Sequence, residues 1–204
     1  MPTLPDHVIL LHGLWMRGYA MQLLALRLRQ AGFTTEIFQY PTLRNTPAQA
    51  AQRLQQRLGD FGPRTVHVIG HSLGGVVALL ATADVDQPGR NLCLGSPLTE
   101  CETARRLQRH APVLMGNSAQ TLIQGLAPWS GPRQVGVIAG NLAVGLGRLL
   151  GRLEGDNDGT VRVAETRLPG ITDHRILPAS HTGLPFLRGC ATLSIHFLRH
   201  GQFA

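Results

Sequence analysis

Thr65-Val66-His67-Val68-Ile69-Gly70-His71-Ser72-Leu73-Gly74-Gly75 is the stretch that decides the fold of this chain. Residues 65–69 are nearly all β-branched and predict a buried strand, and the apolar run at 76–83 predicts a helix. Between them, small residues two positions before and two positions after Ser72 allow the strand end and the helix start to approach closely. The stretch predicts a tight turn that raises the Ser72 hydroxyl above a sheet, at a helix N-terminus whose amide dipoles favour a developing negative charge.

Strand and helix signals alternate on both sides of this turn. Further short apolar runs, expected to be strands that are apolar on both faces, lie at 7–11, 33–38, 91–95, 133–139 and 175–177. Helices are predicted at 19–31, at 47–58 after the capping residue Thr46, and at 184–198. This alternation predicts an α/β fold with a mostly parallel central sheet and helices on both faces.

Length and charge limit the functions that need to be considered. The 204 residues show no internal repeat and no linker, so we expect a single domain over 1–204. The formal net charge is +7, but every basic residue is arginine and these are scattered along the chain with few aromatic residues between them. We therefore expect no nucleic-acid partner, whereas the charge is compatible with peripheral contact with an anionic membrane.

The cysteines and the first residues of the chain bear on the cellular compartment in which the protein is expected. Cys93, Cys101 and Cys190 form an odd set without a C-x-x-C pair, which predicts reduced thiols. The first residues lack the pattern of a signal peptide, so we expect a cytoplasmic protein. Residues 155–159 superficially match a calcium loop but lack its later glutamate, and no motif indicates a cofactor. We predict neither a metal nor a cofactor.

Four motifs together resemble those of the α/β-hydrolase superfamily, and within it small bacterial serine lipases and esterases without a large cap domain. They are Leu10-Leu11-His12-Gly13-Leu14, Gly70-His71-Ser72-Leu73-Gly74-Gly75, Gly155-Asp156-Asn157-Asp158-Gly159-Thr160-Val161 and Ser180-His181-Thr182-Gly183-Leu184. Their order is that of nucleophile, acid and base in this superfamily. The resemblance implies a Ser-His-Asp triad with a backbone oxyanion hole, in a chain that cleaves carboxylic esters through an acyl-enzyme.

The base has to be chosen among nine histidines. A serine hydroxyl needs a neutral imidazole to accept its proton and a carboxylate to orient that imidazole. His67 lies within a predicted strand, and His71 is expected to point away from Ser72. His181 follows the last predicted strand, on a loop at the carboxyl edge of the sheet, and is our candidate base.

The acid is less clearly marked. Asp158 fits a G-x-x-D-x-x-V arrangement with Gly155 and Val161 that is common in similar hydrolases, and Asp156 is its close competitor. Glu100, Glu102 and Asp173 are weaker alternatives, and the whole segment also reads as a polar turn. The acid follows its strand unusually late, after an insert at 140–153 that we expect to help wall an apolar acyl pocket.

The resemblance also assigns the oxyanion hole to the backbone N–H groups of Leu14 and Leu73. Candidate substrate contacts are His12, Gly13, Trp15, Met16 and His71, although core packing explains these side chains equally well. Residues 97–129 combine a charged helix at 103–109 with an apolar stretch. This region is expected to form a small lid or wall, or else a helix packed against the sheet edge.

These motifs specify the reaction class more firmly than the substrate. We expect a small-molecule or lipid ester. An acyltransferase or a thioesterase would use the same triad, and a catalytically silent binding protein on a hydrolase scaffold is the alternative from another class.

Overall fold

The computed structural model describes residues 5–144 and 153–204. Six strands form one parallel sheet in the order β2-β1-β3-β4-β5-β6. They are β1 (His7–Leu11), β2 (Thr34–Phe38), β3 (Val66–His71), β4 (Asn91–Leu94), β5 (Val135–Gly140) and β6 (Asp173–Leu177). The α/β fold class and the parallel sheet predicted from the sequence are confirmed.

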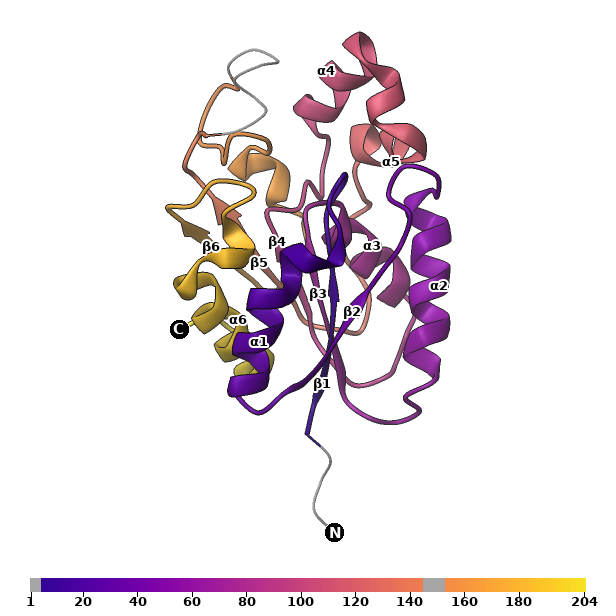
Figure 1. The fold of residues 1–204 in the computed structure, drawn as a ribbon, viewed down its shortest axis with the longest axis vertical. Coiled ribbons are helices and arrows are strands. Elements are labelled where there is room, and N and C mark those ends of the chain that lie inside the picture. Colours follow the sequence, from indigo (N-terminus) through magenta and orange to yellow (C-terminus); the bar gives the residue numbers. More distant parts are fainter. Residues whose placement is uncertain (1–4, 145–152) are drawn as a thin grey trace.

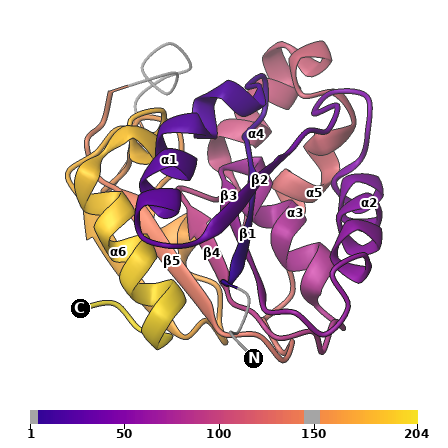
Figure 2. The same ribbon diagram turned by 60° about the horizontal axis from the view of Figure 1, so that its bottom comes forward.

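Helices cover both faces of this sheet. Figure 1 and Figure 2 show α1 (Gln22–Gln30) and α6 (Arg188–His200) on one face, and α2 (Pro47–Gly59) and α3 (Leu73–Thr82) on the other. The helices α4 (Glu102–His110) and α5 (Ala119–Gln124) lie beyond the carboxyl ends of the strands. Within the described ranges, no separate cap domain covers the sheet and no helix is long and apolar enough to cross a bilayer.

Successive residues of the strands enter two different cores. Ile9 and Leu11 of β1 belong to the core under α2 and α3, whereas Val8 and Leu10 belong to the core under α1 and α6. Side chains alternate across a strand, so a strand covered on both faces must be apolar at every position. This explains why the central strands appear in the sequence as continuous apolar runs.

The edge strand β6 differs from the prediction that every strand is apolar on both faces. Its residues are only partly buried or exposed, Ile176 is 38% exposed, and Arg175 pairs with Asp173 at 3.7 Å. An edge strand has one sheet neighbour and is accessible to solvent, so it tolerates charged side chains. The prediction was wrong for this strand, and also for the other edge strand, β2, which is fully buried only at Phe38.

Helix boundaries also shift where the first turn is irregular. The predicted helix at 19–31 begins as a 3₁₀ turn, η1 (Gly18–Met21), before α1. The predicted helix at 184–198 consists of a 3₁₀ turn, η6 (Leu184–Phe186), and α6, separated by Leu187 in an extended conformation. In contrast, α2 begins as predicted, with a reciprocal capping box between Thr46 and Gln49.

Candidate active site

The turn between β3 and α3, which we call the elbow (residues 70–75), holds Ser72 in a strained conformation. Ser72 has φ +53° and ψ −123°, and its N–H donates to the carbonyl of Leu94 at 2.8 Å. A Cβ on Gly70 would lie 2.2 Å from the backbone of Gly74, far inside contact distance. Strand and helix therefore meet backbone to backbone, and this close approach requires glycine.

Ser72, His181 and Asp158 lie in one hydrogen-bonded series. The Oγ of Ser72 is 2.9 Å from Nε2 of His181, and Nδ1 of His181 is 2.7 Å from Oδ2 of Asp158. The buried carboxylate accepts a hydrogen bond from Nδ1–H, which leaves Nε2 as an acceptor for the serine hydroxyl. The structure thus brings together the three residues that the sequence nominated.

The segment around Asp158, which we call the acid turn (residues 155–161), orients this carboxylate through its own backbone. Oδ1 of Asp158 accepts hydrogen bonds from the N–H groups of Thr160 at 3.0 Å and Val161 at 2.7 Å. Two donors on Oδ1 leave Oδ2 directed at His181. The loop between β6 and η6, which we call the base loop (residues 178–183), shares a backbone hydrogen bond with the acid turn, from the N–H of His181 to the carbonyl of Asp158 at 2.9 Å.

The competing carboxylates lie elsewhere. Asp156 is exposed, and its backbone carbonyl accepts a hydrogen bond from Val163. Glu100 pairs with Arg105, Glu102 pairs with Arg106, and Asp173 accepts from the N–H of Phe203. Of the five acidic residues considered, only Asp158 is hydrogen-bonded to His181.

His71 contacts the base loop from within the elbow. It is fully buried, and its Nε2 lies 2.8 Å from the carbonyl oxygen of His181. Burial, together with the nearby His181, lowers the pKa of His71 to about 3, so this ring is neutral and donates from Nε2. The backbone of His181 is therefore held at its N–H by Asp158 and at its carbonyl by His71.

The loop after β1 lies against the elbow. A Cβ on Gly13 would be 2.9 Å from the Cβ of Ser72, so the chain passes directly beside the nucleophile candidate. The next residue, Leu14, lines the same cavity as Ser72, and Leu73 provides the first N–H of α3, which has no partner within the helix. Leu14 and Leu73, the residues nominated as oxyanion donors, therefore line the same cavity as Ser72.

His12 and Gly13 do not line the cavity, although the sequence nominated them for substrate contact. The buried His12 ring stacks on Tyr40 with 4.8 Å between ring centroids, and the hydroxyl of Tyr40 donates to the His12 carbonyl at 2.7 Å. Burial lowers the pKa of His12. These contacts fix the turn at the end of β1, whereas Trp15, Met16 and His71 do line the cavity.

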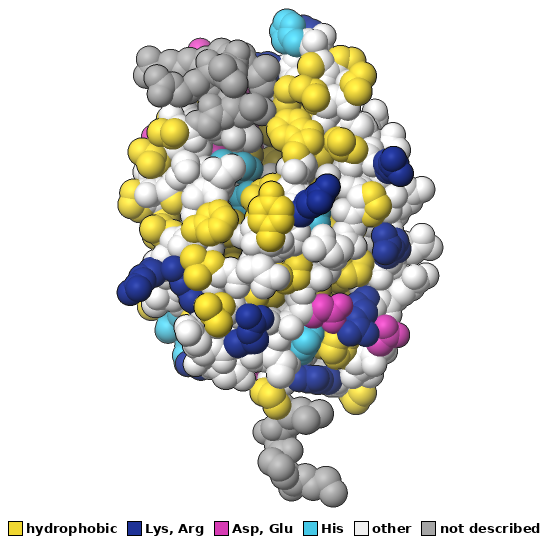
Figure 3. Space-filling model, viewed as in Figure 1, with side chains coloured by type: hydrophobic (Ala, Val, Ile, Leu, Met, Phe, Trp, Pro, Cys, Tyr) yellow, Lys and Arg dark blue, Asp and Glu magenta, His cyan; other side chains and the backbone are white. Residues whose placement is uncertain are grey.

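The cavity at Ser72 and His181 has a volume of about 320 Å³ and mostly apolar walls. One wall comes from the region 97–129, for which the sequence left a small lid or wall and a helix packed against the sheet edge as alternatives. The residues of this region that line it are Pro97, Cys101, Thr103, Ala104, Leu107, Met115 and Leu122. Of the insert at 140–153, Val144 lines the cavity, while 145–152 lie outside the described residues. Figure 3 shows apolar side chains gathered around a hollow on the upper part of this face.

Sequence reasoning did not single out the wall residues of α4. Their signal is weak, because Ala104 and Leu107 are simply buried on one side of a charged helix.

Cys101, Cys93 and Cys190 are free and buried, and burial raises the pKa of each thiol to about 12. Within the described ranges no group of three or more His, Cys, Asp and Glu side chains could hold a metal.

The chain belongs to the alpha/beta hydrolase family, whose model matches residues 8–189. No curated protein sequence is significantly similar to it.

Solved structures share the fold at low identity. A lipase of Bacillus licheniformis in its mature form is 18% identical with a TM-score of 0.73, and the match covers 98% of this chain and 92% of the lipase. A metagenomic carboxyl esterase is 16% identical with a TM-score of 0.71, covering 90% of this chain and 66% of the esterase. A type II thioesterase from the yersiniabactin biosynthetic pathway is 12% identical with a TM-score of 0.66, covering 100% and 98%.

Proposed function

We propose that this hydrolase-family chain is a serine hydrolase that cleaves carboxylic esters through an acyl-enzyme. The observation that carries the proposal is the hydrogen-bonded series from Ser72 through His181 to Asp158, at 2.9 and 2.7 Å, at the base of an apolar cavity. A neutral imidazole between a serine hydroxyl and a buried carboxylate is the arrangement that activates serine for attack.

In the proposed reaction, Nε2 of His181 takes the hydroxyl proton while Oγ of Ser72 attacks the ester carbonyl. The N–H groups of Leu14 and Leu73 stabilise the oxyanion, and each such donor typically lowers the barrier by about 2.7–4 kcal/mol. His181 then gives its proton to the departing alcohol, and later activates the water that releases the acid. Asp158 keeps the imidazole in its reactive tautomer and stabilises the imidazolium.

The mostly apolar walls of the cavity favour a substrate with an apolar acyl group, either a small-molecule ester or a lipid ester. A thioester would use the same triad, so the triad does not distinguish a thioester from an ester. An alcohol or amine in place of water would turn the same acyl-enzyme into a transferase intermediate. Product analysis with added acceptors separates hydrolysis from transfer.

Labelling with a fluorophosphonate probe tests the proposal without a known substrate. Intact-mass spectrometry and peptide mapping should find a single adduct on Ser72, and Ser72→Ala protein should remain unlabelled. The variant should unfold at nearly the same temperature, since the hydroxyl is a small part of the turn. Folded wild-type protein without an adduct would contradict the proposal and favour a silent scaffold.

We also propose that the enzyme binds anionic membranes peripherally. The net charge of +7 and the exposed Trp15, Tyr19 and Val113 support this. The protein should sediment with phosphatidylglycerol vesicles at low salt, less at high salt, and not with phosphatidylcholine vesicles. No binding to anionic vesicles at low salt would rule this contact out.

A further inference from the structure

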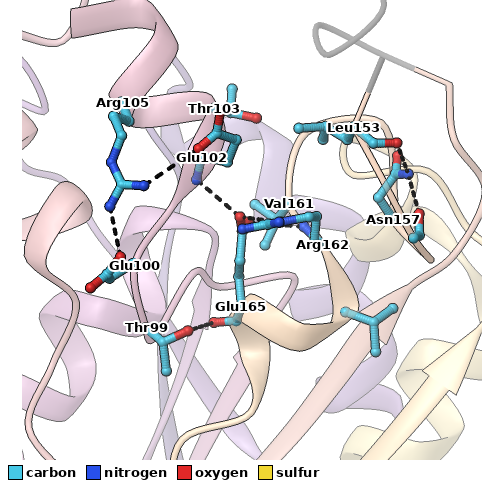
Figure 4. Close-up of polar contacts among 12 residues, drawn as sticks. Thr99, Glu100, Glu102, Thr103, Arg105, Leu153, Asn157, Val161, Arg162 and Glu165 are labelled. Carbon is cyan, nitrogen blue, oxygen red and sulfur yellow. Dashed lines mark hydrogen bonds and ion pairs between the residues drawn. The ribbon is translucent and has the colours of Figure 1, made fainter. Parts of the chain in front are cut away.

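A second buried carboxylate, Glu165, lies close to the acid turn. It belongs to the 3₁₀ turn η5 (Val163–Thr166) and is only 2% exposed. Its Oε1 accepts hydrogen bonds from the N–H of Glu102 at 2.9 Å and from Nε of Arg162 at 2.7 Å, and its Oε2 accepts from the N–H of Arg162 at 3.0 Å (Figure 4). A buried carboxylate is tolerated only with such partners, so its position is closely defined.

On one side Glu165 holds the start of α4. Glu102 is the first residue of this helix, and the N-cap residue Cys101 provides no side-chain cap. The Glu165 carboxylate therefore caps α4 from a distant part of the chain, at the positive end of the helix dipole. The backbone carbonyl of Glu165 also accepts from the N–H groups of Leu98 at 2.8 Å and Thr99 at 3.0 Å, in the segment that leads to α4.

On its other side Glu165 holds the acid turn. Arg162 directly follows Val161, whose N–H is bonded to Oδ1 of Asp158. A second bond joins the two regions directly, from the hydroxyl of Thr103 in α4 to the carbonyl of Thr160 at 2.5 Å. Both α4 and the acid turn line the cavity, so the distance between these two regions sets the width of the cavity.

We propose that Glu165 is a positioning residue that holds the α4 wall against the acid turn and thereby sets the preference for acyl-chain length. The inference rests on the proposed esterase function. A short acyl group occupies only the space beside Ser72, whereas a longer chain must contact α4 side chains such as Leu107. Each buried methylene contributes about fourfold to binding, so a displaced wall penalises long chains selectively.

The test compares two identical substitutions. Glu165→Gln keeps the size of the side chain but removes its charge. It also turns an amide NH₂ group towards N–H groups that donate to the carboxylate in the wild type. Glu100→Gln is the matched control, because Glu100 also lies in the segment leading to α4 but is 68% exposed and pairs with Arg105. The substrates are 4-nitrophenyl acetate and 4-nitrophenyl octanoate.

We expect the ratio of kcat/KM for octanoate to that for acetate to fall about tenfold in E165Q, mainly through KM for octanoate. In E100Q this ratio should stay within about twofold of wild type. Amide hydrogen exchange gives a readout that does not depend on turnover. Peptides covering 102–110 and 156–163 should exchange faster in E165Q, and not in E100Q, when compared with wild type.

Arg162→Met serves if E165Q does not fold. It removes the ion pair of a side chain that is 35% exposed and does not line the cavity, so it should shift the ratio and the exchange in the same direction by less. An equal loss of activity on both esters, or unchanged exchange of the α4 peptide, overturns the Glu165 proposal alone. Wild-type protein that hydrolyses neither ester overturns the proposed function, and with it the assignment of chain-length preference.

Discussion

The elbow and the acid turn both deliver a residue to the proposed triad, but different forces fix them. The elbow is defined by steric contact, because a Cβ on Gly70 would meet the start of α3 and a Cβ on Gly74 would meet the carbonyls of Leu11 and His12 at the end of β1. The acid turn is defined by polar contacts, because both oxygens of the Asp158 carboxylate are engaged by N–H donors.

This difference predicts different consequences of mutation. Adding one carbon to the elbow forces two backbone segments apart and should damage the fold. Removing one charge from the acid turn leaves its shape nearly unchanged, because an amide oxygen can still accept hydrogen bonds, and should damage only the chemistry. Steric and electrostatic control can therefore be separated by measuring stability and activity on the same variants.

Among substitutions that leave Ser72 and His181 in place, Asp158→Asn should have the largest effect on activity. An amide at this position can present its NH₂ group to Nδ1 of His181, which favours the wrong tautomer and removes the charge that stabilises the imidazolium. We expect kcat for ester hydrolysis to fall about 10⁴-fold, with little change in the melting temperature. Asp156→Asn, two residues away and exposed, should stay within about threefold of wild type. Equal activities in the two variants would show that Asp158 is not the acid.

Gly70→Ala should have the largest effect on stability. Its Cβ would lie 2.2 Å from the backbone of Gly74, and backbone cannot rotate away as a side chain can. We expect the free energy of unfolding to fall by about 3 kcal/mol or more in urea titrations. Gly189→Ala in α6 is the control, because a Cβ there meets nothing within 4 Å, and it should be neutral or stabilising. A Gly70→Ala protein as stable as wild type would mean that the elbow is not sterically defined.

The elbow was predictable because its constraints are local. Strand, turn and helix follow one another within residues 65–83, and the glycines that permit the close approach are part of the same motif. The central strands were equally clear, because burial on both faces makes them continuously apolar. The edge strand β6 was found only in part, at 175–177, because an edge strand is open to solvent and carries charged side chains that interrupt the apolar run.

The surroundings of the acid were less predictable because their constraints are not local. Asp156 and Asp158 have the same chemistry two residues apart, and the spacing to Gly155 and Val161 only favours Asp158, whereas the hydrogen bond to His181 distinguishes the two directly. Glu165 could not be singled out, since its bond to Glu102 spans 63 residues. The sequence supplied the candidates, whereas their selection depended on which segments meet at the carboxyl edge of the sheet.

His71 connects the elbow to the base loop and should have an intermediate effect. His71→Leu removes the donor to the carbonyl of His181 and leaves that buried oxygen without its partner. We expect kcat to fall about tenfold, which corresponds to one lost hydrogen bond. His71→Gln keeps an N–H donor and should recover part of the loss, whereas equal rates in the two variants would show that the bond does not position His181.

The last predicted effect concerns the pH dependence of stability and compares a histidine near each region. Burial lowers the pKa of His71 in the elbow to about 3 and that of His174, bonded to Thr166 of η5, to about 4. Both values lie below the 6.5 of an unfolded histidine, so below pH 6.5 the unfolded chain binds protons that the folded chain excludes. The free energy of unfolding should therefore fall as the pH drops from 6.5 towards 4, with each histidine contributing at most about 1.4 kcal/mol per pH unit.

The same titration assigns this loss to particular histidines. His174→Gln keeps a polar side chain next to Thr166 but removes one titrating group, so the slope of stability against pH should decrease by about one proton between pH 4.5 and 6. Urea unfolding at several pH values measures that slope. If the slope in His174→Gln equals that of wild type, His174 takes up its proton in the folded state, and the region beside the acid turn is more open to solvent than the elbow.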